Sequence, residues 1–169
     1  MLEIRAELAG DAPFVHAVNV SAFPTRDEAD LVDVLRDNAE PVISLVAVQD
    51  GRIIGHIMFS PVELSSNQNL KIMGLGPMAV SPDEQSLGIG AKLVSEGLVR
   101  CKDIGAGAVV VLGHPTYYPR FGFVPASESN IRCEYDVPDD TFMIIELTND
   151  YLSGAEGTIR YYEAFGNTT

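Results

Sequence analysis

The chain is poor in cysteine, and this excludes two classes of site. Only two cysteines, Cys101 and Cys133, occur among its 169 residues. Two thiols do not make a disulfide framework, and their spacing is not that of a metal site. The three histidines, His16, His56 and His114, lie far apart in the sequence and show no ligand spacing either. We therefore expect reduced thiols, a cytoplasmic protein and no metal.

Basic residues are also few, which bears on the partners. Lys and Arg number 11 against 24 Asp and Glu, so the formal net charge is −13. A surface of this charge repels nucleic acid and anionic lipid, and would suit a cationic or amine substrate. No apolar run approaches the roughly 20 residues that cross a bilayer. The segment Met1–Arg5 also lacks the basic and apolar regions of a secretory signal. We expect neither a nucleic-acid partner nor a membrane.

Apolar runs separated by turn residues predict one α/β domain over residues 1–169. The core is expected over about 2–148, and an aromatic tail over 149–169, which could support a homodimer. The predicted strands cover residues 2–5, 43–48, 53–64, 70–80, 108–112 and 142–147. Helices are predicted for residues 12–22, from 25 to before Pro41, and from the glycine loop to about 103. Residues 127–140 are polar and are expected to be irregular.

Four local signals refine these elements. The Asp50-Gly51 pair predicts the turn of a hairpin. Gly74, Gly76 and Pro77 predict a bulge, or the place where strand pairing stops. Two helical signals complete the list: Thr25 as an N-cap with Glu28 three residues on, and an apolar stripe formed by Leu87, Ala91, Val94, Leu98 and Cys101.

The segment Gln85–Gly90, with the sequence QSLGIG, is the most informative part of the chain. It follows a predicted strand and opens a predicted helix, whose first turn carries unpaired N–H donors and a partial positive charge. Glycines remove the Cβ atoms that would hold a ligand away, so such a place binds phosphate. With an acidic protein around it, a phosphate would depend on backbone amides, helped by Lys92.

Two common phosphate motifs are absent. Leu93 stands where a dinucleotide motif would have its third glycine, and no Gly-Lys-Ser or Gly-Lys-Thr is present. On these residues alone, a phosphate site and a plain tight turn remain equal alternatives.

Two separated blocks resemble the GNAT superfamily of N-acyltransferases. The first is Gln85-x-x-Gly88-x-Gly90 after a strand ending Met78-Ala79-Val80, which resembles the acyl-CoA signature. The second is residues 109–123, VVVLGHPTYYPRFGF, which is similar to a group of bacterial predicted N-acetyltransferases. The order of elements over about residues 4–124 and the tail 157–165 also agree with that group.

The resemblance implies a bent, mostly antiparallel mixed sheet with a V-shaped opening, flanked by helices. Acetyl-CoA would be the co-substrate. Its pantetheine would pair with the backbone of Met78 and Val80 around Ala79. The implied diphosphate and loop contacts are Gln85, Ser86, Leu87, Gly88, Ile89, Gly90, Ala91 and Lys92.

The resemblance also implies an acid. Tyr118 occupies the position where these enzymes often carry a tyrosine near the CoA sulfur, and a phenol can protonate a departing thiolate. Tyr117 would replace it if the register differed by one residue. A core aromatic whose hydroxyl lies at the rim is the structural alternative for Tyr118.

Candidates for the general base are Glu63, Glu28 and His114, each of which is otherwise a surface or loop residue. His114 stands where the group more often has an acidic residue. His56, within a strand, is expected to be a satisfied core histidine. Cys101, on the apolar stripe, is not expected to carry an acyl group.

These observations predict an acetyl-CoA-dependent N-acetyltransferase that acts by direct transfer to a primary amine of a small molecule or protein. The rival from another class is a non-catalytic acyl-CoA-binding or regulatory domain. A third alternative is an α/β interaction domain whose glycine loop is only a turn.

Overall fold

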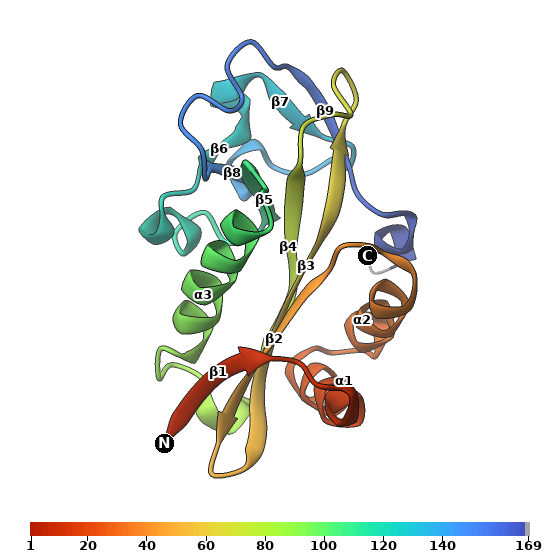
Figure 1. Ribbon diagram of the computed structural model, residues 1–169, viewed down its shortest axis with the longest axis vertical. Coiled ribbons are helices and arrows are strands. Elements are labelled where there is room, and N and C mark those ends of the chain that lie inside the picture. The colour runs from red at the N-terminus through yellow and green to blue at the C-terminus, as the bar shows by residue number, and fades with distance from the viewer. Residues whose placement is uncertain (168–169) are drawn as a thin grey trace. The chain divides into compact units, whose positions relative to one another are not determined.

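The computed structural model describes residues 1–167 and has a mixed α/β architecture (Figure 1). Its strands are β1 (Leu2–Ala6), β2 (Ile43–Gln49), β3 (Arg52–Leu64), β4 (Ile72–Val80), β5 (Ala108–Leu112), β6 (Val124–Pro125), β7 (Ile131–Cys133), β8 (Phe142–Glu146) and β9 (Gly157–Arg160). Its α-helices are α1 (Ala12–Ala22), α2 (Asp27–Asn38) and α3 (Ile89–Asp103). Within this part of the chain, no helix has the length and apolar character needed to span a membrane.

The chain forms two compact units. The first contains Met1–Ser60, Gly76–Gly97 and the residues from Glu163 onward, and the second contains Pro61–Leu75 and Leu98–Tyr162. Long elements, namely β3, β4 and α3, contribute to both.

In the first unit, an antiparallel hairpin forms the centre of the sheet. β2 pairs with β3 from Ile43↔Phe59 to Gln49↔Arg52, and β1 pairs with the other edge of β2. Asp50 and Gly51 have φ angles of 53° and 78°, which is the left-handed conformation of a two-residue hairpin turn. The hairpin predicted from the Asp-Gly pair is therefore confirmed.

Helices cover both faces of β3 in this unit (Figure 1). Consecutive strand residues point to opposite faces. A Cβ added to Gly55 would lie 3.2 Å from Leu93 of α3, whereas the next residue, His56, contacts Asn19 of α1. The pair α1 and α2 therefore lies on one face, and the first part of α3 on the other.

The predicted start of α2 is wrong. α2 begins at Asp27, its N-cap residue is Arg26, and no side chain caps it. Thr25 instead accepts a hydrogen bond from the Asp27 N–H at 3.3 Å, which is a local turn and not the predicted capping box with Glu28.

The predicted stripe of α3 is shifted, because the helix begins only at Ile89. Leu87 precedes the helix and is 65% exposed. In the first unit the buried face of α3 is formed by Ile89, Leu93, Val94 and Gly97. A Cβ on Gly97 would overlap the ring of Phe59, so this glycine allows α3 to approach β3 closely.

In the second unit β5 lies at the centre of the sheet. It pairs in parallel with β4 from Ile72↔Ala108 to Leu75↔Val111, and antiparallel with β8 on its other side. All five residues of the predicted strand 108–112 are in β5. Valines and alanine dominate this strand, as expected for one enclosed on both faces.

The segment 127–140 is more regular than predicted. It contains β7, which pairs in parallel with β9 through Ile131↔Gly157 to Cys133↔Ile159. β9 also pairs with the end of β3, so the tail completes a small three-stranded sheet. Ile131 and Ile159 are buried in the core of this unit.

Candidate functional site

Within the described residues, β4 extends beyond its pairing with β5. Its pairing with β5 stops at Leu75, directly before Gly76 and Pro77. This confirms that pairing stops where the glycines and proline indicated. In the first unit, Met78 and Val80 are half-buried and Ala79 is 2% exposed. Alternate residues direct their backbone N–H and C=O groups to the same edge, so the backbone groups of Met78 and Val80 share one edge of β4.

The loop after β4 is anchored at both ends. The Ser81 N–H donates to the Ile54 carbonyl of β3 at 2.8 Å. The Gln85 side chain then turns back, and its Nε2 donates to the Val80 carbonyl at 3.0 Å. Gln85 therefore shapes the loop from within, which is the contact expected of a residue that organises the site.

The loop reaches α3 through two left-handed residues. Ser86 and Gly88 have φ angles of 69° and 81°. A Cβ at Gly88 would meet no atom within 4 Å, so conformation, and not crowding, explains the glycine there. Gln85, Ser86, Leu87 and Gly88 are all exposed, and the chain is accessible along this turn.

The start of α3 offers free donors. The first helical hydrogen bond runs from the Lys92 N–H to the Gly88 carbonyl at 3.2 Å. The N–H groups of Gly88, Ile89, Gly90 and Ala91 precede it and have no partner within the helix. Together with the helix dipole, they form a place that favours an anion, and the exposed Lys92 lies one residue farther on.

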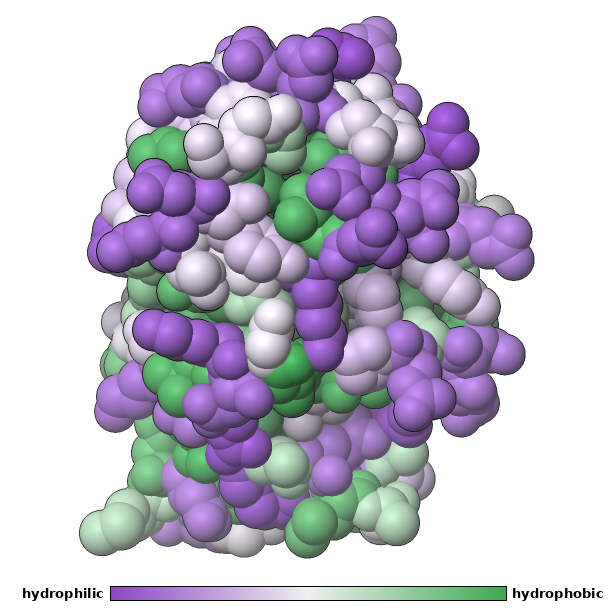
Figure 2. Space-filling model, turned by 45° about the horizontal axis from the view of Figure 1, so that its top comes forward, coloured by the Kyte–Doolittle hydropathy of each residue, from purple (hydrophilic) through white to green (hydrophobic). Residues whose placement is uncertain are grey.

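Local geometry must supply this attraction, because the wider surface is acidic. The face in Figure 2 is covered mostly by hydrophilic residues, with smaller hydrophobic patches between them. The chain as a whole carries −13. A bound phosphate would therefore depend on the amides of the loop.

The second unit contains an aromatic cluster after β5. Tyr118 is 8% exposed, and its ring meets Tyr117 edge-on at 5.1 Å and Phe123 edge-on at 5.7 Å between centroids. Arg120 lies over the Tyr117 ring, with 4.3 Å from its guanidinium carbon to the centroid. The Tyr118 hydroxyl makes no hydrogen bond to any residue between 1 and 167.

Burial moves the titration of this phenol farther from neutral pH. It raises the pKa of Tyr118 to about 12, with a further contribution from Tyr117. Tyr118 is therefore a protonated donor at neutral pH. Tyr117 is half-buried, and burial raises its pKa as well, opposed by the charge of Arg120.

The three candidate bases have different surroundings. His114 is exposed, and its carbonyl accepts the Tyr117 N–H at 3.1 Å, so it belongs to the turn that carries the tyrosines. Glu63 is exposed on β3 opposite Arg160 of β9. In the first unit Glu28 is half-buried on α2, and its Oε1 is enclosed without a hydrogen-bond partner in the described chain. The structure thus brings His114 near the tyrosines and leaves the base unassigned.

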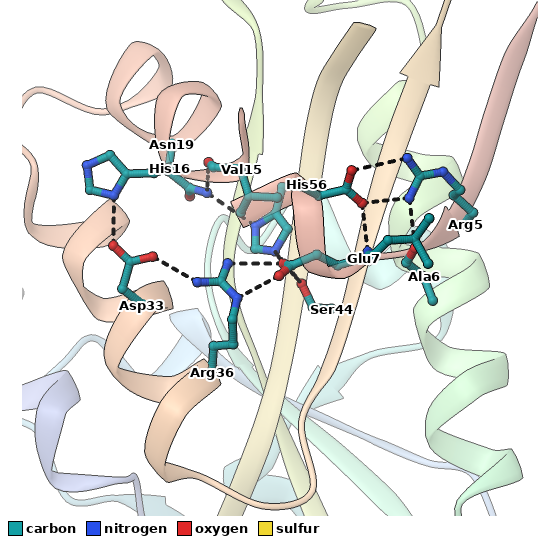
Figure 3. A network of polar contacts seen from close by, with 12 residues as sticks. Arg5, Ala6, Glu7, Val15, His16, Asn19, Asp33, Arg36, Ser44 and His56 are labelled. Carbon is teal, nitrogen blue, oxygen red and sulfur yellow. Dashed lines mark hydrogen bonds and ion pairs between the residues drawn. The ribbon is translucent and has the colours of Figure 1, made fainter. Parts of the chain in front are cut away.

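His56 is a satisfied core histidine, as predicted (Figure 3). It is 0% exposed, and burial together with the charge of Arg36 lowers its pKa to about 3. Ser44 can only donate to the Glu7 carboxylate, at 2.6 Å, so the His56 Nε2–H must donate to Ser44 at 2.8 Å. His56 Nδ1 then accepts from the Asn19 amide at 3.2 Å. One neutral tautomer fits all of these contacts.

Glu7 connects this histidine to an ion-pair chain, which the sequence did not reveal. The Arg36 guanidinium donates to Glu7 at 2.6 and 3.1 Å and to Asp33 at 2.8 Å, and Asp33 contacts His16 at 2.9 Å. These residues come from the segment after β1 and from α1 and α2 (Figure 3). The network fixes both helices to the sheet within the first unit.

Two other groups bear on earlier predictions. Cys101 is 0% exposed, and burial raises the pKa of its thiol to about 12, so it has no nucleophilic character at neutral pH.

His16, Asp30 and Asp33 can bring one ligand atom each within 4.8 Å of one another. Asp33 is already paired with Arg36, so we assign no metal there.

Comparison with known proteins now identifies the family. A family model described as Acetyltransferase (GNAT) family matches residues 10–123. The chain belongs to this family. The uncharacterized N-acetyltransferase YhbS of Escherichia coli K12 is 37% identical over 163 residues, which cover 96% of this chain and 97% of YhbS.

Two solved GNAT structures extend the comparison. The crystal structure of YhbS from Escherichia coli in complex with CoA has a TM-score of 0.93 and 35% identity, covering 99% of this chain and 93% of that one. A GNAT acetyltransferase from Brucella melitensis in complex with acetyl-CoA has a TM-score of 0.79 and 34% identity, with 98% of each chain covered. The predicted family, its mixed and mostly antiparallel fold and the class of enzyme, an N-acetyltransferase, are therefore confirmed.

Proposed function

We propose that this GNAT-family chain uses acetyl-CoA to acetylate a primary amine of a small molecule or a protein. The observation that carries the proposal is the row of N–H groups from Gly88 to Ala91, which have no backbone partner within residues 1–167, at the end of a loop that Gln85 organises. The complexes of the relatives with CoA and acetyl-CoA support the same co-substrate.

The binding residues fit the parts of this co-substrate. We assign the diphosphate to the N–H groups from Leu87 to Ala91, with Ser86 and Lys92 beside them. We assign the two pantetheine amides to the backbone of Met78 and Val80, which lies beyond the end of β4–β5 pairing. Exposure of the loop leaves room for an anion at the helix start.

The chemistry requires an acid for the leaving group. The amine nitrogen attacks the thioester carbonyl, the new C–N bond forms, the C–S bond breaks, and the CoA thiolate takes a proton. Tyr118 fits the donor, because a phenol is protonated at neutral pH and the Tyr118 hydroxyl has no hydrogen-bond partner within residues 1–167. Glu63, His114 and Glu28 remain the candidates for removing the proton of the amine. We assign Tyr117 to binding of the co-substrate.

We propose direct transfer in a ternary complex, and the state of Cys101 supports it. Cys101 is buried and protonated, so it offers no acyl-enzyme route. The acidic surface suits an acceptor that approaches as a cation. We further propose a cytoplasmic bacterial enzyme, one domain over residues 1–169, and a homodimer built on the tail.

Thiol release from acetyl-CoA, measured with a panel of primary amines, tests the function. Release that depends on the amine, with acetylated product identified by mass spectrometry, supports the proposal. Saturable acetyl-CoA binding without thiol release across the panel would instead indicate a non-catalytic acyl-CoA-binding domain. If acetyl-CoA did not bind at all, the chain would instead be an interaction domain in which the glycine loop is only a tight turn.

A further inference from the structure

Two glycines flank β5, and each lies beneath a tyrosine ring. Gly107 precedes the strand and faces Tyr151, and Gly113 follows it and faces Tyr118. Neither glycine has a positive φ, so neither is required by backbone conformation. Space for the ring is what excludes a side chain at both positions.

The contact at Gly113 is very close. A Cβ there would overlap Cε2 of the Tyr118 ring and lie 2.9 Å from Cδ2 and 3.3 Å from Cζ. Carbon atoms in contact are normally about 3.5–4.0 Å apart. The Gly113 N–H is bonded to the Thr141 carbonyl at 3.0 Å, which holds the backbone, so the ring is the part that must move.

The other neighbours of Tyr118 limit how its ring can respond. Tyr117 and Phe123 meet it edge-on, and Phe121 is tilted against it at 6.3 Å between centroids. Because the ring is enclosed by these three aromatics, a methyl group at Gly113 would change its tilt and carry the hydroxyl with it. The hydroxyl has no hydrogen bond in the described chain to hold it in place.

We propose that Gly113 is a positioning residue, which sets the location of the Tyr118 hydroxyl by giving its ring a surface without a side chain. This inference rests on the proposed role of Tyr118 as the acid. It adds a steric requirement at a residue that would not itself touch the substrate.

The test compares Gly113→Ala, Tyr118→Phe and the double variant in the amine-dependent thiol-release assay. Tyr118→Phe should lower kcat about 100-fold, at the lower end of what general acids contribute. Gly113→Ala should lower kcat at least about tenfold with KM for acetyl-CoA unchanged, because a displaced acid loses part of that contribution. The double variant should match Tyr118→Phe, since a phenylalanine has no hydroxyl to misplace.

Gly107→Ala is the matched control. Its Cβ would overlap three atoms of the Tyr151 ring, a more severe clash than that at Gly113, at the opposite end of the same strand, and Tyr151 has no proposed part in the reaction. Gly107→Ala should lower the melting temperature as Gly113→Ala does, with kcat retained at a temperature where the protein is folded.

The outcomes separate this inference from the proposed function. If Tyr118→Phe keeps wild-type kcat, the acid role fails and the inference fails with it. If Tyr118→Phe loses activity but folded Gly113→Ala keeps it, or the two changes multiply in the double variant, only the positioning role is overturned.

A second variant covers the case in which Gly113→Ala does not fold. Phe123→Leu removes one enclosing ring without adding a clash, so it should also lower kcat, and only when the Tyr118 hydroxyl is present. An unchanged kcat in folded Phe123→Leu would contradict the proposal that the surrounding residues position the Tyr118 ring.

Discussion

Acidification should destabilise the protein through His56, which folding keeps neutral. The unfolded chain binds a proton at this histidine below its ordinary pKa of 6.5, whereas burial and Arg36 hold the folded pKa at about 3. The folded state therefore excludes a proton that the unfolded state accepts. Stability linked to His56 is fully present above pH 6.5 and is lost as the pH falls from 6.5 toward 3.

The size of the effect follows from these two values. Each pH unit below 6.5 costs about 1.4 kcal/mol, so the loss between pH 7 and pH 5 should be about 2 kcal/mol. For a chain of this length that is a fall in melting temperature of roughly 4–8 °C. The carboxyl of Asp11 does not contribute in this window, because its hydrogen bond with Arg5 lowers its pKa below the ordinary 3.8.

Urea unfolding at pH 7 and pH 5 measures this loss directly. His56→Gln removes the titrating group, so its loss between the two pH values should be about 2 kcal/mol smaller than that of the wild type. The exposed His114→Gln controls for substitution of a histidine and should keep the wild-type loss. Equal losses in wild type and His56→Gln would refute the buried, neutral state of His56.

Three further outcomes are expected. Acetyl-CoA at 100 times its Kd should stabilise the wild type by about 2.7 kcal/mol and so raise its melting temperature. The control Gly10→Trp should show the same rise, whereas Gly90→Trp should show none. An undiminished rise in Gly90→Trp would show that the start of α3 is not part of the binding site. Cys101→Ala should retain turnover and give no acyl-enzyme in mass spectra, and a loss of turnover in the folded variant would indicate an acyl-cysteine route. Because burial raises the pKa of Tyr118 to about 12, kcat should show no Tyr118-dependent fall up to about pH 11; a fall centred near pH 10 that Tyr118→Phe removes would show a solvated phenol.

Strong local patterns made much of the fold predictable. β5 is a continuous apolar run between glycines, and its predicted bounds match the structure. The turn at Asp50 and Gly51 fixed the register of its hairpin through left-handed backbone angles that few other pairs adopt. In both cases the information lies within a few consecutive residues.

Elements that depend on distant partners were missed. β7 and β9 are three and four residues long; they pair with each other in parallel, and β9 also pairs with the end of β3. No local period marks strands this short. The start of α2 was misplaced for a related reason, since Thr25 matched a capping pattern but bonds only within a turn.

In the candidate site too, features set by consecutive residues were predictable, and features that depend on distant residues were not. The helix start after Gln85 was predictable, because glycines and an expected helix imply free N–H groups whatever the rest of the fold does. His56 bonds to Asn19 and Ser44, and Ser44 bonds to Glu7; these three residues come from separate segments, and no sequence spacing predicts that they meet. Gly113 could be recognised only as a break after a strand, because its function depends on a ring five residues away.

A crystal structure with CoA bound tests the central claim most directly. We expect diphosphate oxygens within hydrogen-bonding distance of the N–H groups from Gly88 to Ala91, with a pantetheine amide on Met78 or Val80. Coenzyme bound elsewhere, with the turn from Gln85 to Gly90 free of phosphate, would contradict the account.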